Sequence, residues 1–454
     1  MQKSSVIKGE WYIPDNPEKK LSGTLFLSHY DRITLELVGS FDEPIDQIKF
    51  LPKDTIQGIT TKGEKITLCN CLVFSINSAL SKLPETKYLI HLVALGEHYN
   101  NEGSIYGKKV RTRIDLLEKW VNIYNYDIDT SIDGKLELKS KTLEEKSFQI
   151  DSETTGRFFF TNTYSLIRSP AFTYNQITYF EIESSNDKTN IQNFITQLFK
   201  FKKLVTIGVT EEVSLVDVTI IKDDGRDSKP VEIFFNQNKP IDNLDRLNHH
   251  DFFFTFTDLE SRLDEIANNW FNNESLEPII NYLFIFFQNR KSYAEDTFLD
   301  GIRGLEVFHR RLRQNTIELK ESFDITIDRI CSNLETDDSK LIREKLEYAY
   351  EPSLRIRLKD LISEMDEEIV NIFFKGKTSV KKFINKVTIA RNYYTHFSEN
   401  LKKSAVKGAD LIYLSKKTNL FLEILLLIEI GLSIDTIKNL LDRYYYKISY
   451  FMEK

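Results

Sequence analysis

The spacing of apolar residues changes near residue 240, and this change limits the folds open to the chain. Before it, short runs rich in β-branched and aromatic residues alternate with turn signals. In Arg32–Val38 every second residue is apolar, which is the period of a strand with one buried face. Beyond Asp258 the apolar residues recur three and four positions apart, as in amphipathic helices. A β-rich part is therefore followed by a helical part.

These two periods predict an α+β multidomain protein. The length of 454 residues agrees, because a single hydrophobic core rarely grows beyond about 250–300 residues. We expect a β-rich, sandwich-like domain over residues 1–240, which two sub-domains of about 1–150 and 151–240 could make up. We expect an all-α helical bundle over residues 258–454, joined to it by a linker at Asn238–Asn243.

The net charge of −7, from 61 Lys and Arg against 68 Asp and Glu, is uneven along the chain. Residues 371–420 hold 11 basic and two acidic residues, a net charge of +9, so the rest of the chain carries −16. A basic strip on an acidic protein is a candidate surface for nucleic-acid phosphates. The alternative is a solvated helix face that pairs with the acidic residues of 321–370.

Cysteine content and hydropathy predict a cytoplasmic protein. Three cysteines are too few for a disulfide framework, and the N-terminus lacks the apolar segment of a signal peptide. The longest apolar run, Leu420–Leu432, contains Glu423 and Glu429 and is too short to span a bilayer. We therefore expect no membrane partner.

Arg391, Asn392 and His396 lie inside the basic strip, on a helix expected over residues 378–399. On a helix, Arg391 and His396 would be about 140° apart around the axis and about 7.5 Å apart along it. Asn392 and His396, four positions apart, would share a face, so that Asn392 could orient the imidazole. Such a set suits a cleft between two helices or between two protomers.

The residue types fit cleavage of RNA. Attack by a ribose 2′-OH on the adjacent phosphate needs a base for the hydroxyl proton and an acid for the departing 5′-oxygen, and histidine suits both roles at neutral pH. The forked, permanently charged guanidinium of arginine suits phosphoryl oxygens. This chemistry requires no metal, and we expect neither a metal nor another cofactor.

An arginine and a histidine at this spacing form a weak signal by themselves. Arg303 and His309 form a similar pattern with five intervening residues. The alternative interpretation of either pair is a surface arginine beside a packed histidine. The basic strip, the Arg-Asn pair and the adjacent tyrosines favour Arg391 and His396 as the functional pair.

Other side chains could support such a site. Glu306, His309 and Arg310 share a helix face and could hold Arg391 by an ion pair, or could form an intrahelical ion-pair cluster with a packed histidine. Candidate RNA-binding residues are two tyrosines, for stacking on bases, and five lysines, for phosphates: Tyr393, Tyr394, Lys381, Lys382, Lys386, Lys402 and Lys403. The alternatives are core packing for the tyrosines and solvation for the lysines.

Both parts of the sequence resemble one known family. Arg391–His396 resembles the R-x4-6-H signature of HEPN-domain ribonucleases, and Leu305–Arg310 resembles an early helix of the HEPN domain in ApeA-type bacterial anti-phage proteins. The first half resembles the N-terminal domain of those proteins in six short segments: Gly9–Pro14, Gly23–Leu25, Ile33–Gly39, Ile56–Gly58, Ile66–Leu68 and Leu117–Val121.

This resemblance implies a metal-independent endoribonuclease of abortive infection, which acts as a homodimer or higher homo-oligomer with both signatures in one composite cleft. It implies that Arg391 and His396 are catalytic, that Asn392 orients, and that the products carry 2′,3′-cyclic phosphate and 5′-OH ends. The implied partners are RNA, with tRNA as one candidate substrate, and a phage-derived trigger. Two alternatives stay open: a non-catalytic HEPN module that binds RNA or a partner, and a sensor of a phage component in which the bundle only dimerises.

Overall fold

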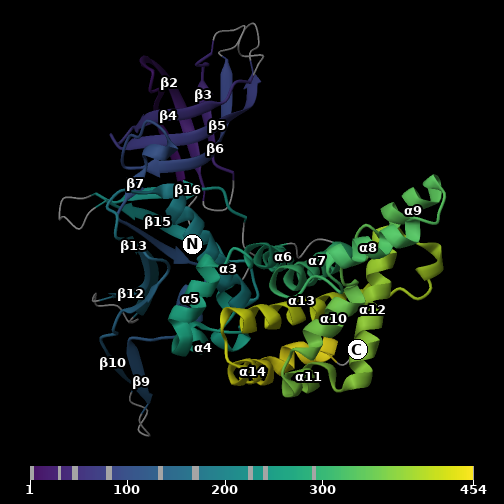
Figure 1. The fold of residues 1–454 in the computed structure, drawn as a ribbon. Coiled ribbons are helices and arrows are strands. Elements are labelled where there is room, and N and C mark those ends of the chain that lie inside the picture. The colour runs from purple at the N-terminus through teal and green to yellow at the C-terminus, as the bar shows by residue number, and fades with distance from the viewer. Residues whose placement is uncertain are drawn as a thin grey trace. The chain divides into compact units, whose positions relative to one another are not determined.

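The computed structural model describes residues 5–28, 32–42, 50–77, 84–130, 136–165, 173–222, 229–238, 244–288 and 293–452. The chain divides into two compact units, Met1–Asn272 and Asn273–Lys454, the first mostly of strands and the second of helices (Figure 1). The predicted α+β multidomain class is therefore confirmed. Most of the expected linker, Asn238–Asn243, lies outside the described residues.

Six strands of the first unit close into an antiparallel barrel. They are β1 (Ser5–Ile13), β2 (Asn16–Leu27), β3 (Thr34–Val38), β4 (Lys53–Thr60), β5 (Lys65–Asn77) and β6 (Glu85–Leu95). Their order is β6-β3-β2-β1-β4-β5, and β5 pairs with β6 to complete the ring. Alternate side chains fill the interior around the fully buried Trp11. Gly58 leaves room for that indole, because a Cβ there would lie 2.3 Å from Trp11 Cε3.

β6 belongs both to the barrel and to a second part of the sheet. On one edge, its first half pairs with β3 and its second half pairs with β16 (Val231–Phe235). Asn236 joins the two at the branch, because its amide nitrogen donates to Ile90 O (2.8 Å) and its amide oxygen accepts from Ile33 N–H (3.0 Å). One continuous sheet therefore runs through the β-rich unit.

Beyond the barrel the sheet continues in the order β16-β15-β8-β13-β12-β11. These strands are β15 (Leu215–Ile221), β8 (Lys109–Ile114), β13 (Tyr174–Ser184), β12 (Thr154–Tyr164) and β11 (Lys146–Gln149). Two further small sheets pair β7 (Tyr106–Gly107) with β14 (Thr189–Asn190) and β9 (Tyr126–Thr130) with β10 (Leu136–Ser140). The long helix α3 (Ile191–Val209) packs on the sheet, where Phe201 stacks on Phe180 of β13 with ring centroids 3.7 Å apart.

The division between the units lies after the sequence-based start of the bundle at residue 258. The short helices α2 (Leu117–Val121), α4 (Phe256–Leu259) and α5 (Leu263–Asn272) all belong to the first unit. In α5, Trp270 Nε1 donates to Lys200 O (2.9 Å), and Phe271 stacks on Phe148 of β11. Helical spacing placed this segment with the bundle, but its apolar face packs on the β-rich unit.

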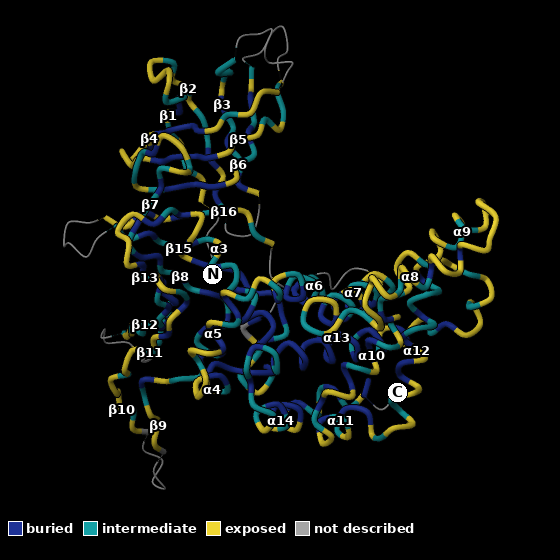
Figure 2. Tube along the Cα trace, in the orientation of Figure 1, coloured by how far each residue is buried: buried dark blue, intermediate teal, exposed yellow. Residues whose placement is uncertain are grey.

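The second unit is helical. Its described helices are α6 (Glu277–Gln288), α7 (Ala294–Leu312), α8 (Lys320–Cys331), α9 (Thr336–Leu346), α10 (Leu354–Ser363), α11 (Glu367–Phe374), α12 (Lys377–His396), α13 (Gly408–Ile430) and α14 (Ile434–Met452). α13 is buried along most of its length, whereas α9 is largely exposed (Figure 2). Gly304 lets α7 approach α13, because a Cβ there would lie 2.5 Å from Leu422 Cδ2. No helix in the described part of the chain is long and apolar enough to cross a membrane.

Candidate active site

α12 carries the three residues of the candidate catalytic set. The helix ends at His396, because Phe397 adopts a left-handed conformation (φ 47°) and donates its N–H to Tyr393 O (2.6 Å). His396 therefore occupies the last helical position, where its side chain is exposed. These bounds agree closely with the helix expected over residues 378–399.

Arg391 is held from two sides. Its Nη2 lies 3.6 Å from Glu306 Oε1 on α7, and its Nη1 donates to Asn392 Oδ1 (3.4 Å). The ion pair with Glu306 is thus present as the sequence suggested. Asn392 contacts Arg391 instead of orienting His396, since no hydrogen bond joins Asn392 to His396 among the described residues. Within one chain, the orienting contact is therefore made to the arginine.

The helices α7, α10 and α12 pack against one another (Figure 1). Arg391 lines a groove between them. The groove has a volume of about 650 Å³. Its charged lining residues are Arg310, Arg355, Arg357 and Arg391 together with Glu306 and Glu351. His396 does not line it. In a single chain, the arginine and the histidine of the motif therefore face different surroundings, as their spacing on the helix predicted.

His309 and Arg310 lie near Arg357, which the sequence analysis did not single out. Arg357 is almost fully buried, and its Nη1 donates to His309 Nδ1 (3.1 Å). Because Nδ1 then accepts, His309 Nε2 carries the proton and donates to Asp360 Oδ2 (3.3 Å). Burial lowers the pKa of His309, and Arg357 adds to that effect while Asp360 opposes it. His309 is therefore a neutral bridge in the core.

The same network extends to Glu351 at the groove. Arg357 Nη2 donates to Glu351 Oε2 (3.0 Å), and Arg310 Nη2 donates to the same oxygen (2.8 Å). Of the three expected supporting residues, only Glu306 contacts Arg391 directly. The sequence offered little indication that Arg357 is buried. The residues around it form an ordinary amphipathic helix pattern, in which an arginine is usually exposed.

The candidate RNA-binding residues fall into different environments. Tyr394 is buried and its hydroxyl donates to Val406 O (2.9 Å), which matches core packing. Tyr393 is half-buried, with Lys407 Nζ 5.2 Å from its ring centroid. Lys402 pairs with Glu399 (3.1 Å) and is exposed. Four other exposed lysines complete the set, three on α12 and one after it: Lys381, Lys382, Lys386 and Lys403.

Within the described residues, no group of three or more His, Cys, Asp or Glu side chains is arranged to hold a metal ion. Cys69 and Cys71 on β5 are both buried. Burial raises the pKa of Cys69 to about 12. These thiols are therefore core residues in this chain.

Two family models match this chain. One, described as ApeA N-terminal domain 1, matches residues 6–270, and the other, described as Apea-like HEPN, matches residues 299–436. The chain belongs to the ApeA family. The resemblance drawn from the sequence is thereby confirmed across both parts. Neither a curated protein nor a solved structure matches the chain.

The ApeA matches agree with the two compact units. The first covers the β-rich unit almost entirely, and the second runs from α7 to the first turn of α14. The second includes Arg391, His396 and Glu306. At the level of the family, an ApeA-like HEPN domain indicates a nuclease-type role in anti-phage defence.

Proposed function

We propose that this ApeA family member is a metal-independent HEPN endoribonuclease of abortive-infection defence. The observation that carries the proposal is the pair of side chains on α12: Arg391 lines an arginine-rich groove, and His396 is exposed at the end of the same helix. Membership of the family and the charge of +9 over residues 371–420 support it.

The catalytic site is composite in this proposal. Arg391 and His396 are about 140° apart around α12, so one chain does not present both to the same phosphate. Two copies of α12 facing each other would place the Arg391 of one protomer near the His396 of the other. The active species is therefore a homodimer or a higher homo-oligomer, and each cleft contains residues of both protomers.

The chemistry needs three roles. One His396 accepts the proton of the ribose 2′-OH, whose oxygen attacks the adjacent phosphorus, and the His396 of the partner subunit donates a proton to the departing 5′-oxygen. Arg391 stabilises the negative charge on the phosphoryl oxygens. Glu306 and Asn392 position the guanidinium. The products are a 2′,3′-cyclic phosphate and a 5′-OH end.

The proposal also includes a substrate and a trigger. RNA with exposed single-stranded loops, of which tRNA is one candidate, is the substrate, and the cytoplasm is the site of action. The β-rich unit responds to a phage-derived trigger. Tyr393 and the lysines of α12 are the candidate contacts to bases and phosphates.

The test uses purified wild type, His396→Ala and Arg391→Ala on labelled total RNA in the presence of EDTA. We expect the wild type to cleave and both variants to lose cleavage by at least about 100-fold, the scale of a lost general acid–base group. Arg303→Ala is the matched control, since Arg303 belongs to the other arginine–histidine pattern and forms its ion pair with Asp300 (2.8 Å), away from the groove. It should cleave like the wild type.

Four outcomes contradict the proposal. Equal cleavage by wild type and both variants ends the assignment of the site, and loss of all cleavage in EDTA ends the metal-free mechanism. RNA binding that persists in His396→Ala, with no cleavage by the wild type, indicates a non-catalytic module. Overexpression that is harmless whether or not His396 is intact favours a sensor in which the bundle only dimerises.

A further inference from the structure

Residues 317–350, which include α8 and α9, form a helical arm of the second unit. The two helices contact each other, and Arg343 Nη1 lies 2.7 Å from Asp328 Oδ1 between them. At the base of the arm, where its two ends meet, Ile317 N–H donates to Tyr350 O (2.8 Å). The arm extends away from the other helices of its unit (Figure 1), and most of its residues are exposed (Figure 2).

The arm exposes many apolar side chains and buries few. Seven large ones are between 38 % and 69 % exposed: Ile317, Leu319, Ile325, Ile330, Leu334, Leu341 and Tyr348. The helix α9, which is described over its whole length, has 11 residues, and none of them is buried. Isolated helices shorter than about 12–15 residues are marginal in water. The arm therefore needs a packing partner beyond the contacts that its own chain supplies.

The base of the arm is also one wall of the groove that contains Arg391. Ile317 and Tyr348 line this groove and are 58 % and 64 % exposed. Each has an exposed acid beside it in the sequence, because Glu318 follows Ile317 and Glu347 precedes Tyr348. An acidic rim repels the phosphates of RNA and favours a basic protein surface. This wall of the groove therefore suits an apolar and basic partner.

A surface with those properties follows α12. Phe397 comes directly after His396 and is 66 % exposed. Its ring packs edge-on against Tyr393, with centroids 5.7 Å apart, and Lys407 Nζ lies 5.2 Å from the Tyr393 centroid. Lys403 and Lys407 are both exposed. The segment after α12 thus presents an exposed phenyl ring among lysines.

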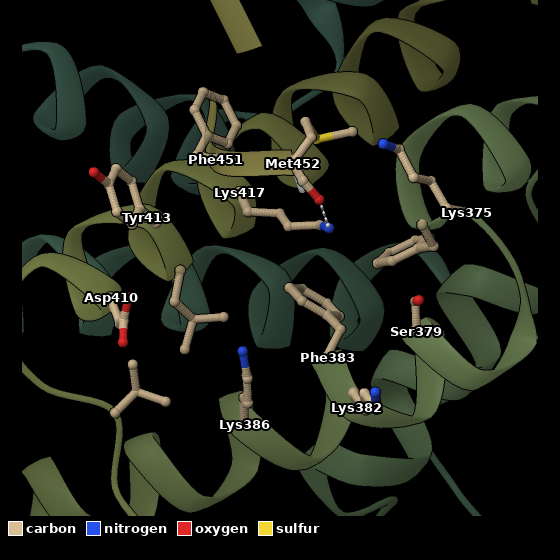
Figure 3. Close-up of a pocket in the computed structure, with 13 residues that line it drawn as sticks. Lys375, Ser379, Lys382, Phe383, Lys386, Asp410, Tyr413, Lys417, Phe451 and Met452 are labelled. Carbon is tan, nitrogen blue, oxygen red and sulfur yellow. Dashed lines mark hydrogen bonds between the residues drawn. The ribbon is translucent and has the colours of Figure 1, made fainter. Parts of the chain in front are cut away.

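This surface is separate from another group of lysines in the basic strip. Four of them line a cavity of about 430 Å³ between α12, α13 and the end of α14 (Figure 3): Lys375, Lys382, Lys386 and Lys417. Phe397, Lys403 and Lys407, which are all described, are not among the lining residues of that cavity. The segment after α12 is therefore a distinct part of the strip.

We propose that the base of the arm is a docking surface for a second copy of this chain, and that it receives the segment after the partner's α12. The inference rests on the proposed composite site, in which the partner's His396 approaches the groove of Arg391. Because Phe397 follows His396, the partner's Phe397 reaches the groove wall at the same time. It packs there between Ile317 and Tyr348.

The charges of the two surfaces complement each other. Glu318 and Glu347 face the lysines of the partner's segment, Lys403 and Lys407, so that opposite charges meet on both sides of the phenyl ring. The whole arm has nine acidic and five basic residues, which adds to this attraction. By two-fold symmetry, each chain offers one arm and receives one. The arm thereby holds the partner's His396 at the groove.

Sedimentation velocity of the full chain without RNA, over a series of protein concentrations, tests the inference. We expect Ile317→Ser and Phe397→Asn each to weaken self-association by at least about tenfold, because each removes one apolar side chain from the interface. Asparagine suits the left-handed backbone of residue 397 (φ 47°). Thermal unfolding of each variant checks that it is folded.

Ile128→Ser is the matched control for Ile317→Ser. Ile128 lies on β9 of the β-rich unit and is 56 % exposed, so the same apolar side chain is removed from a similar environment. The Kd of self-association should change by less than about twofold. Equal weakening in Ile128→Ser and Ile317→Ser would indicate general apolar association and would overturn the inference.

Reversal of the charges identifies which surfaces meet. One variant carries Glu318→Lys and Glu347→Lys, and a second carries Lys403→Glu and Lys407→Glu. Each alone should lose self-association at concentrations where the wild type dimerises, because like charges then face each other in both contacts. An equimolar mixture should recover a heterodimer, because every contact in it again joins opposite charges. No recovery in the mixture would overturn the inference, and an arm that packs on the partner's arm would give that result.

These measurements report association and not cleavage, so their outcome is separate from that of the nuclease assay. Self-association that is unchanged in every arm variant overturns this inference and leaves the composite site standing. A wild type that is monomeric at all concentrations also overturns it. Loss of self-association in the arm variants of a chain that cleaves no RNA supports the inference and contradicts only the catalytic role.

Discussion

The guanidinium of Arg391 lies 3.6 Å from the carboxylate of Glu306 on the neighbouring helix α7. The two side chains are 32 % and 26 % exposed, so the ion pair adds only about 0–1 kcal/mol to stability. Its main effect is geometric, because Glu306 and Asn392 together restrict the orientation of the Arg391 guanidinium. In the proposed reaction, this restriction places the guanidinium at the groove before RNA arrives.

Glu306 should therefore affect catalysis more than folding. We expect Glu306→Gln to lower kcat for RNA cleavage by about 5- to 50-fold, the scale of a misplaced catalytic group, with little change in KM. The melting temperature should shift by less than about 3 °C. Asp300→Asn, which removes the Asp300–Arg303 pair of the same helix, should change neither quantity. A wild-type kcat in Glu306→Gln would show that Glu306 does not position the catalytic arginine.

A composite site predicts complementation between two inactive variants. In a mixture of Arg391→Ala and His396→Ala, heterodimers contain one intact Arg391 and one intact His396 on different protomers. We expect this mixture to recover a small part of RNA cleavage, because its cleft keeps one of the two histidines and one of the two arginines, whereas each variant alone lacks one residue type entirely and stays inactive. His396→Ala mixed with the Arg391→Ala/His396→Ala double variant is the control and should recover nothing. If the first mixture also stays inactive, one intact Arg391 and one intact His396 on different protomers do not make a working site.

Arg357 should be essential for stability. It is buried and donates to His309, Asn315 and Glu351, so Arg357→Met leaves three polar groups without this donor. We expect the free energy of unfolding in urea to fall by about 3 kcal/mol, typical of breaking a buried charged network. Arg355→Met is the control, because Arg355 is exposed on the same helix, and it should cost less than about 1 kcal/mol. Equal losses in both variants would contradict the buried network.

Glu423 predicts a pH-dependent loss of stability. It is buried in α13, its Oε1 has no hydrogen-bond partner among the described residues, and burial raises its pKa well above 4.5. Between the unfolded and folded pKa values the folded chain keeps a proton that the unfolded chain releases. The unfolding free energy should therefore fall as pH rises above 4.5, by up to about 1.4 kcal/mol per pH unit from this group.

Glu423→Gln removes that titration. Its unfolding free energy relative to the wild type should rise steadily from pH 5 to pH 8 in urea titrations. Glu344→Gln, which removes an exposed carboxylate on α9, should show a constant difference across the same range. A constant difference for Glu423→Gln as well would show that this carboxyl ionises normally in the folded chain.

The site illustrates how far local spacing can predict contacts. Residues three and four apart on a helix share a face, so grouping Glu306, His309 and Arg310 was sound. In the structure, however, Glu306 meets Arg391, while His309 and Arg310 meet Arg357 and Glu351. Residues of this face of α7 contact different helices, because α10 and α12 both pack against it. The partners on those helices cannot be inferred from the spacing on α7.

In the β-rich unit, too, the sequence predicts local structure but not the contacts between distant segments. Alternation in the sequence predicts strands and their inward faces, and Ile33, Leu35 and Leu37 are all buried as expected. Alternation does not say which strand pairs with which. The pairing of β1 with β4 and of β5 with β6 closes a barrel where the sequence suggested a sandwich-like domain.

By itself, the sequence determined the change from strand period to helix period, the basic strip and the placement of Arg391 and His396 on one helix. These properties are local, since a hydrophobic period or a charge count depends on residues a few positions apart. Only the tertiary structure decided that Glu306 pairs with Arg391, that His309 bridges Arg357 and Asp360, and that four lysines of three segments line one cavity. Those contacts join residues distant in the chain, and the packing of whole helices sets them.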